Sequence, residues 1–296
     1  MRTITSHDDL PVAANDSGEH AFESPGLRVV GDGPPVLLLH AWMSSKAQWD
    51  PLMYRLEGRH RCIAVDLHGY GDNPPAPQGE DFSLDDDVEL IRGYLSDLAL
   101  ANEPLHIVAH SYGAAVALRF AQRLPACVAS LSLHEPTAFN VLDEDGQEAA
   151  AVAGLVHRVS SLVAEGRGLQ AARFFIDSWN GPGSFEHLST LQRARSAAQV
   201  AQLALGYRAV MTTPMRLAHC HSIHARTLLL GGARSEPATR QVLTRLAEAL
   251  PNAKSEWTDA DPMPLIEGFI DIDVKRTWPS RAVNVFRLLA RRLASA

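Results

Sequence analysis

The residues best suited to chemistry in this chain are five consecutive ones, Ala109-His110-Ser111-Tyr112-Gly113. They follow the small–any–nucleophile–any–small pattern of a nucleophile elbow, a tight strand-to-helix turn that exposes the nucleophile. The preceding segment LHIVAH has the length and composition of a buried strand, and the following segment GAAVALRFAQRLP is Ala-rich with helical spacing. This placement favours a true elbow over a chance match. Ser111 is therefore the predicted reactive or hydroxyl-donating residue, and the helix after it directs free N–H groups at any oxyanion formed there.

Apolar strands alternate with amphipathic helices around this elbow. Strand-length runs are PVLLLHAW, RCIAVDL, LHIVAH and ASLSLHEP, and helical spacing covers residues 46–57 and 84–100. In the second helix Ser83 is a suitable N-cap, and Asp85, Asp86 and Asp87 place negative charge in the first turn. Strands that are apolar throughout are typical of a mostly parallel sheet covered on both faces. The predicted fold class is therefore α/β.

The alternation is interrupted after Pro136. Residues 137–222 have helical periodicity, contain the loop segment WNGPGSF and show no clear strand. The alternation of strands and helices resumes with the strand RTLLLGG, a helix over 237–250, a short strand over 254–258 and a last helix from Ser280. We predict an α/β core made of residues 1–136 and 223–296, beginning with a loose arm over residues 1–20. A helical cap, residues 137–222, is inserted before the last two strands.

Two further segments complete a family pattern. His40-Ala41-Trp42 closes the first apolar strand, and DLHGYGD over residues 66–72 is a Gly-rich turn after the next one. With the elbow and the cap, they make residues 27–296 similar to the α/β-hydrolase superfamily. The segments WNGPGSF and GGARSEP resemble small bacterial carboxylesterases and C–C hydrolases. The resemblance implies an oxyanion hole formed by the backbone N–H groups of Trp42 and Tyr112, with Ala41 replacing the usual glycine.

The acid of the expected catalytic triad is displaced. The family's acid position after the strand RTLLLGG is occupied by Ser235, which cannot orient an imidazole as a carboxylate does. A known alternative in the superfamily places the acid at the end of the strand before the cap, where this chain has Glu135. We favour Glu135 over Glu236, which suits the first turn of a helix. A purely structural carboxylate at Glu135 remains an equal alternative.

The histidine that should activate Ser111 is absent from its expected loop. That loop has Pro262 at the histidine position, and no histidine follows His224. A serine hydroxyl without a base is a poor nucleophile. Two replacements remain open: Asp259 or Asp261 as a weak carboxylate base, or a displaced histidine. The candidates for a displaced histidine are His134, His187, His219, His221 and His224. His110 points away from the nucleophile in the family and is a poor candidate.

Composition limits the partners. The chain has 296 residues with a formal net charge of −7 and no basic run, which argues against nucleic acid as a partner. It has no signal-peptide pattern and no apolar run of membrane-spanning length, so we expect no membrane partner and a cytoplasmic location. Cys62, Cys127 and Cys220 are predicted free thiols in a reducing compartment. We expect no cofactor and no metal, although Cys220–His224 contains ligand-type residues.

The function predicted from these residues is an enzyme acting on a small, largely apolar ester or carbonyl substrate through Ser111 and an oxyanion hole. Hydrolysis is expected to be weak, or replaced by a lyase, isomerase, cyclase or decarboxylase-type reaction that needs only anion stabilisation. The alternative is a catalytically inactive protein that binds a small ligand or a protein partner between core and cap. The sequence determines neither the substrate nor the oligomeric state.

Overall fold

The core of the protein is one eight-stranded sheet. The computed structural model describes residues 21–75 and 81–277. The strand order is β1-β2-β4-β3-β5-β6-β7-β8; β1 and β2 run antiparallel to their neighbours, and the pairs from β4 to β8 are parallel. The strands are β1 Ala21–Ser24, β2 Leu27–Val30, β3 Pro35–Leu39, β4 Arg61–Val65, β5 Leu105–His110, β6 Val128–His134, β7 Arg226–Gly231 and β8 Ala253–Trp257. The predicted mostly parallel sheet is confirmed.

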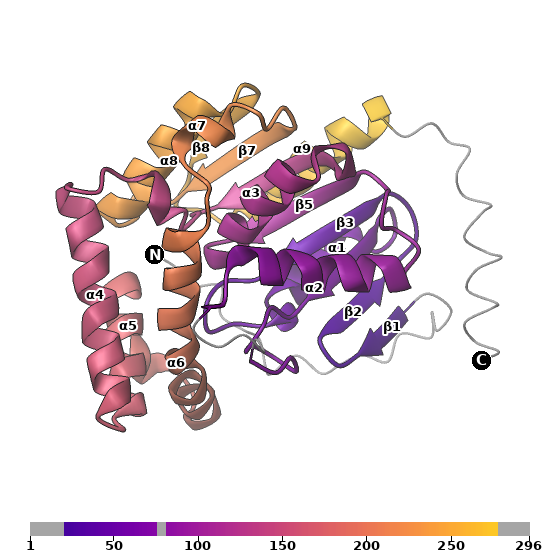
Figure 1. The fold of residues 1–296 in the computed structure, drawn as a ribbon. Coiled ribbons are helices and arrows are strands. Elements are labelled where there is room, and N and C mark those ends of the chain that lie inside the picture. The colour runs from indigo at the N-terminus through magenta and orange to yellow at the C-terminus, as the bar shows by residue number, and fades with distance from the viewer. Residues whose placement is uncertain (1–20, 76–80, 278–296) are drawn as a thin grey trace.

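Helices cover both faces of this sheet (Figure 1). One face packs against α2 (Leu84–Asp97), α3 (Tyr112–Arg123) and α8 (Pro237–Ala249), and the other packs against α1 (Asp50–Leu56) and α9 (Met263–Thr277). Successive residues of a strand point to opposite faces. In β3, for example, Leu37 and Leu39 belong to the first cluster and Val36 and Leu38 to the second. Burial on both faces therefore explains why the central strands are apolar throughout.

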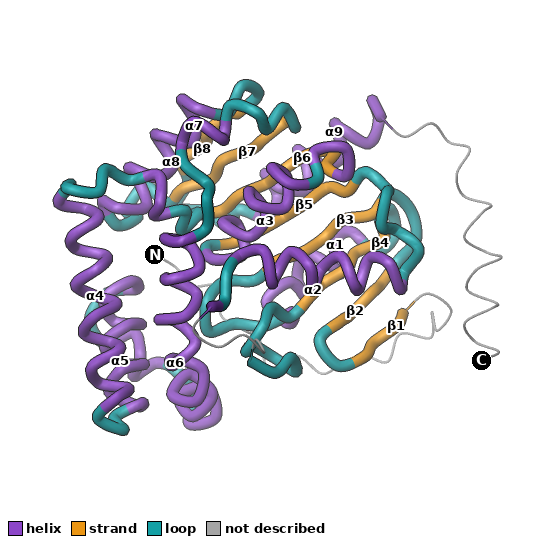
Figure 2. The backbone as a smooth tube through the Cα atoms, viewed as in Figure 1, coloured by secondary structure: helices purple, strands orange, loops and turns teal. Residues whose placement is uncertain are grey.

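A block of helices separates β6 from β7, as predicted. It comprises α4 (Gln147–Ala164), α5 (Gly168–Asn180), α6 (Thr190–Thr212) and the short α7 (Leu217–Cys220), and residues 137–222 contain no strand. In Figures 1 and 2, α4, α5 and α6 lie together at one end of the sheet. The block contacts the core through α4 against α8 and through α6 against α2. The segment WNGPGSF is only partly a loop, because Trp179 and Asn180 end α5.

The segment after β8 differs from the prediction. No helix was predicted between the short strand over 254–258 and Ser280, whereas helix α9 runs from Met263 to Thr277. Asp261 accepts a hydrogen bond from the Met263 N–H at 3.0 Å and so caps the helix start. Glu267 on α9 pairs with Arg55 and Arg59 near α1. The predicted arm over residues 1–20 and the predicted last helix from Ser280 lie outside the described residues.

The three cysteines are buried and unpaired, which confirms that they are free thiols. Burial raises the pKa of Cys62 to about 12 and that of Cys220 to about 11, so both thiols are protonated and unreactive at neutral pH. Among the helices of the described ranges, none has the length and apolar character needed to span a membrane.

Replacing the Asp261 cap should destabilise the protein. We expect Asp261→Ala to lower the free energy of unfolding by about 1 kcal/mol, because an N–H of the first turn of α9 loses its acceptor. The neighbouring Asp259 is the matched control: it is exposed and lies 3.7 Å from Arg234, and Asp259→Ala should change stability by less than about 0.5 kcal/mol. Urea unfolding measures both, and equal effects would contradict the capping role.

Candidate active site

The turn at Ser111 has the backbone of a nucleophile elbow. Ser111 adopts φ 54° and ψ −115°, which a residue with a side chain rarely does. Its N–H donates to the His134 carbonyl at 2.9 Å, and its own carbonyl accepts from the N–H of Ala114 at 3.0 Å and of Thr137 at 3.2 Å. Such strain costs about 1–3 kcal/mol and persists only where surrounding contacts impose it. Here the end of β6 and the start of α3 impose it.

Gly113 allows α3 to begin directly against β3. Its N–H donates to the His40 carbonyl at 3.1 Å, and a Cβ atom added to it would lie 2.5 Å from the Leu39 carbonyl oxygen. Since no real Cβ approaches an oxygen so closely, only glycine permits this packing. The small residue of the predicted elbow motif is therefore required by the approach of two backbones.

The two predicted oxyanion donors are adjacent in the structure. The Trp42 ring stacks on the Tyr112 ring, with centroids 5.4 Å apart and an interplanar angle of 19°. Within the described residues, the backbone N–H groups of Trp42 and Tyr112 donate to no carbonyl. Gly206 of α6 makes room for the Trp42 indole, because a Cβ there would lie 2.6 Å from its Nε1 atom. Ring packing therefore holds in place the two residues whose N–H groups are free to bind an oxyanion.

Asp87 anchors this arrangement from the interior, a role the sequence reasoning missed. It is fully buried and accepts hydrogen bonds from the Tyr112 hydroxyl at 2.7 Å and from the His68 N–H and Nδ1 at 3.0 Å. Burial, followed by the charge of Asp87, raises the pKa of Tyr112 well above its usual range, so the phenol stays protonated. The sequence marked Asp87 only as negative charge at a helix start. Asp85, by contrast, pairs near the surface with Arg119.

Glu135 and Ser235 meet across the carboxyl ends of β6 and β7. The Ser235 hydroxyl donates to the Glu135 carboxylate, and the Gly232 N–H lies 3.4 Å from the same oxygen. Both side chains are buried, and Glu135 has the positive φ of 46°. The serine at the family's usual acid position thus binds the carboxylate at the alternative position. Glu236 is exposed at the start of α8.

The Ser111 hydroxyl makes no hydrogen bond to a histidine or to any other described residue. His110 and His134 stack at 4.7 Å between centroids at the ends of β5 and β6. The amide of Gln48 accepts from the Ala41 N–H through Oε1 and donates from Nε2 to His110 Nδ1 at 3.1 Å. His110 Nδ1 is therefore an acceptor, held by Gln48 and not directed at Ser111.

Both stacked imidazoles are neutral at physiological pH. Burial holds the pKa of His110 well below its usual value, and the neighbouring imidazoles of His134 and His40 lower it further. Burial also lowers the pKa of His134, opposed by the negative charge of Glu135. The structure thus brings His134 beside the elbow backbone and beside Glu135, where it carries no positive charge.

The other histidines considered as displaced bases are exposed. His219 has a hydrogen-bond partner of its own, and His224 lies far from Ser111. His224 lies just before β7, at the amino end of the parallel strands, whereas Ser111 follows their carboxyl end. Six strand residues separate these edges by about 20 Å. His219 accepts from the Arg216 N–H, and His187 lies exposed after α5. His221 is exposed in the turn between α7 and β7.

The loop that should carry the histidine is instead the start of α9. Pro262 is buried, and its carbonyl accepts from the N–H groups of Leu265 and Ile266 at 3.1 Å. Asp261 is used as the helix cap, and Asp259 is exposed beside Arg234. Neither carboxylate is placed as a buried base. No group of three or more His, Cys, Asp or Glu residues able to hold a metal occurs in the described ranges.

Aromatic side chains fill the region between Trp42 and the inserted helices. Phe139 lies 6.3 Å from Trp42 and stacks on Trp179 at 6.2 Å, and Phe175 lies within 6.4 Å of both indoles. Tyr207 of α6 also contacts Phe139. We call this set the aromatic wall. It contacts the elbow through the stacking of Trp42 on Tyr112. It thus gives the site an apolar environment, in which hydrogen bonds to a developing charge are strengthened.

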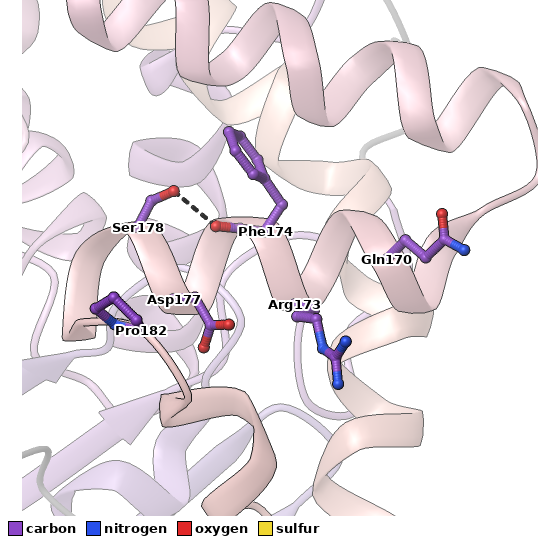
Figure 3. Close-up of a pocket in the computed structure, with 6 residues that line it drawn as sticks. All are labelled: Gln170, Arg173, Phe174, Asp177, Ser178 and Pro182. Atoms are coloured by element: carbon purple, nitrogen blue, oxygen red, sulfur yellow. Dashed lines mark hydrogen bonds between the residues drawn. The ribbon is translucent and has the colours of Figure 1, made fainter.

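An open hollow of 460 Å³ lies on the outer side of α5 and is shown in Figure 3. Its lining residues all fall between Gln170 and Pro182, so it does not include Ser111. Both charged side chains of the hollow have partners within the protein: Arg173 pairs with Glu186, and Asp177 accepts a hydrogen bond from the Phe185 N–H at 2.8 Å. This hollow is therefore a surface feature of α5 separate from the candidate site.

Comparison with known proteins places this geometry in context. Residues 34–269 match the family described as alpha/beta hydrolase fold. A haloalkane dehalogenase of Agrobacterium fabrum is 31% identical over 137 residues, which are 44% of each chain. A pimeloyl-[acyl-carrier protein] methyl ester esterase of Methylococcus capsulatus is 37% identical over 36% of this chain and 39% of its own. The matched stretch thus spans less than half of each of these relatives.

Solved structures match over most of the chain. MenH from S. aureus superposes with a TM-score of 0.68 and 15% identity, covering 86% of this chain and 99% of that one. At such low identity the likeness concerns the fold alone.

The half-buried His110 makes stability depend on pH. An unfolded imidazole takes up a proton near pH 6.5, whereas folded His110 stays neutral to lower pH, so the unfolded state gains protons first. The contribution of His110 to the free energy of unfolding is fully present above pH 6.5 and decreases as the pH falls. We expect His110→Gln to lose about 1 kcal/mol less between pH 7 and pH 5.5 than the wild type. Urea unfolding at both values tests this; equal losses, or an equal effect of the exposed control His187→Gln, would contradict it.

Proposed function

Because the chain belongs to the α/β-hydrolase fold family, over residues 34–269, we propose that it is an enzyme acting on a small, largely apolar ester or carbonyl substrate. In this proposal the backbone N–H groups of Trp42 and Tyr112 bind the oxyanion, and Ser111 contacts the same centre. Glu135 is the carboxylate of the site. The hydrolytic names of the dehalogenase and esterase relatives support an enzyme of this family.

One observation carries the proposal: the strained turn at Ser111 is intact while its hydroxyl lacks a histidine partner. A triad serine is activated by an imidazole that takes its proton during attack. Without that base, Ser111 acts as a hydrogen-bond donor or as a weak nucleophile. Preorganised N–H donors lower the energy of an oxyanion whatever bond is broken, and this effect is often the largest single contribution to catalysis.

The chemistry therefore favours reactions that proceed through an enolate-like or tetrahedral oxyanion without an acyl-enzyme. Lyase, isomerase, cyclase and decarboxylase-type steps meet this requirement, whereas ester hydrolysis is weak. Glu135 suits such a step as the local proton acceptor or orienting charge, since Ser235 and Gly232 already fix its carboxylate at the elbow. The half-buried His134 next to it has a lowered pKa and contributes no positive charge.

The second candidate is a catalytically inactive protein that binds a small ligand against the aromatic wall. The observation that favours it is the loss of both the usual acid, replaced by Ser235, and the usual histidine, replaced by Pro262. The two candidates differ in one measurable property, because only the first accelerates a reaction.

Ser111→Ala should have a small effect on ester hydrolysis. With p-nitrophenyl butyrate we expect slow turnover by the wild type and a fall in kcat of less than about tenfold in the variant, because the remaining rate comes from the oxyanion donors and binding. The exposed Ser222→Ala is the matched control and should be unchanged. A fall of about 10³-fold or more would show an activated serine and contradict the proposal. No acceleration over buffer, for esters and for enolisable ketones alike, would favour the inactive alternative.

A further inference from the structure

The loop after β3 and the elbow each carry one of the two N–H groups that the proposed function assigns to an oxyanion. Trp42 lies in that loop, and Tyr112 begins α3, much later in the chain. Two donors stabilise one oxygen atom only when both point at it, and the groups of such a site must be held within about 0.5 Å of the productive geometry. The site therefore requires a contact that fixes the loop after β3 against the elbow.

Gln48 makes such a contact through a single side chain. It is half-buried, and its Oε1 atom accepts a hydrogen bond from the Ala41 N–H at 3.0 Å. Its Nε2 atom lies 3.1 Å from His110 Nδ1. Ala41 directly precedes Trp42, and His110 directly precedes Ser111. The Gln48 amide thus bridges the loop after β3 and the turn at Ser111.

The direction of both hydrogen bonds follows from the chemistry of the partners. A backbone N–H only donates, so the amide oxygen of Gln48 faces Ala41 and its NH₂ group faces His110. His110 Nδ1 is then the acceptor and carries no proton. Removal of the imidazole from water, the largest cause, holds the pKa of His110 well below its usual value and so keeps this nitrogen available as an acceptor. The amide therefore makes one bond to the loop and one to the elbow, each with a partner of the right kind.

Gln48 completes the hydrogen bonding of the two peptides on either side of Ala41. The His40 carbonyl accepts from the Gly113 N–H at 3.1 Å, and the Ala41 carbonyl accepts from His40 Nδ1 at 2.7 Å. Because the C=O and N–H of a trans peptide point in opposite directions, the Ala41 carbonyl sets the direction of the Trp42 N–H. With the Ala41 N–H held by Gln48, the Trp42 N–H alone among the polar groups of these two peptides has no partner within the described residues.

We propose that Gln48 is a positioning residue of the candidate site. Through Ala41 and His110 it fixes the loop after β3 against the elbow. The N–H groups of Trp42 and Tyr112 are thereby held in a fixed direction relative to each other. The inference rests on the proposed function, because it concerns how the same site holds its oxyanion donors.

Backbone relaxation of the full chain, measured by NMR, tests the positioning without relying on turnover. Gln48→Met keeps an unbranched side chain of similar length but removes both hydrogen bonds. We expect the order parameter of the Trp42 N–H to fall from about 0.85, the value of rigid backbone, toward about 0.6. An unchanged order parameter would overturn the proposal.

Gln122→Met is the matched control. Gln122 is also half-buried and accepts a hydrogen bond from Arg119 at 2.7 Å, but it lies near the other end of α3. This variant should leave the order parameter of Trp42 unchanged. An equal fall in the Gln48 and Gln122 variants would show a general loss of rigidity and overturn the proposal.

Hydrolysis of p-nitrophenyl butyrate provides a second readout. Removing an oxyanion donor costs about 10²–10³ in kcat, and misdirecting a donor that is still present should cost less. We expect Gln48→Met to lower kcat by about tenfold to a hundredfold and to leave KM within about twofold, because alignment matters more in the transition state than in the bound ester. Gln122→Met should change neither value. A rise in KM with kcat unchanged would show a role in binding alone and overturn the proposal.

Gln48→Glu is the conservative variant that should preserve the bridge. Its carboxylate accepts from the Ala41 N–H, and His110 keeps the second bond by donating from Nδ1. We expect kcat within about threefold of the wild type, a rigid Trp42 N–H, and nitrogen-15 chemical shifts of His110 that place a proton on Nδ1, where the wild type has none. A loss as large as that of Gln48→Met, or a His110 Nδ1 that stays unprotonated, would overturn the proposal.

The two readouts separate this inference from the proposed function. No turnover by the wild type, together with loss of Trp42 order in Gln48→Met and its recovery in Gln48→Glu, would contradict the proposed catalysis and leave the positioning role standing. Turnover that Gln48→Met leaves unchanged would contradict only the positioning role.

Discussion

The left-handed backbone at Ser111 is the constraint on which the rest of the site depends. Its N–H is held by the His134 carbonyl and its carbonyl by the Thr137 N–H, so the elbow and the end of β6 are joined on both sides of Glu135. Glu135 itself adopts a positive φ, and its carboxylate is bound by Ser235 after β7. Three neighbouring strands thus contribute to one strained arrangement. Its cost is met by a sheet buried on both faces.

This arrangement explains how the turn at Ser111 keeps its shape although no histidine is bonded to its hydroxyl in the described structure. In the proposed site, oxyanion stabilisation needs only fixed backbone donors, and these depend on Gly113, on the stacked Trp42 and Tyr112 rings, and on the buried Asp87. None of these contacts involves the loop at Pro262. Proton transfer, by contrast, needs a base aligned with the hydroxyl, and that loop is now the capped start of α9. Oxyanion binding and proton transfer from the hydroxyl therefore depend on separate parts of the structure.

The parts of the structure that the sequence predicted are those with local signals. The elbow, the strand pattern and the inserted helices each depend on residues close in the chain. Helix α9 was missed because its stabilising partners, Arg55 and Arg59, lie about two hundred positions away from Glu267. The role of Asp87 was missed because its contacts with His68 and Tyr112 are long-range, while three consecutive aspartates at a helix start have a sufficient local explanation. The contact between Ser235 and Glu135 joins two loops a hundred residues apart. The sequence identified both positions without indicating that they bond.

The proposed function depends on a serine that is exposed by strain but not activated by an imidazole. The most direct measurement is the initial rate of covalent labelling of the purified protein by a fluorophosphonate, compared between wild type and Ser111→Ala. If Ser111 is not activated, the wild type is labelled no faster than the variant at neutral pH. Rapid, complete labelling of the wild type, with the adduct found on the Ser111 peptide and absent from the variant, would show an activated nucleophile and contradict it.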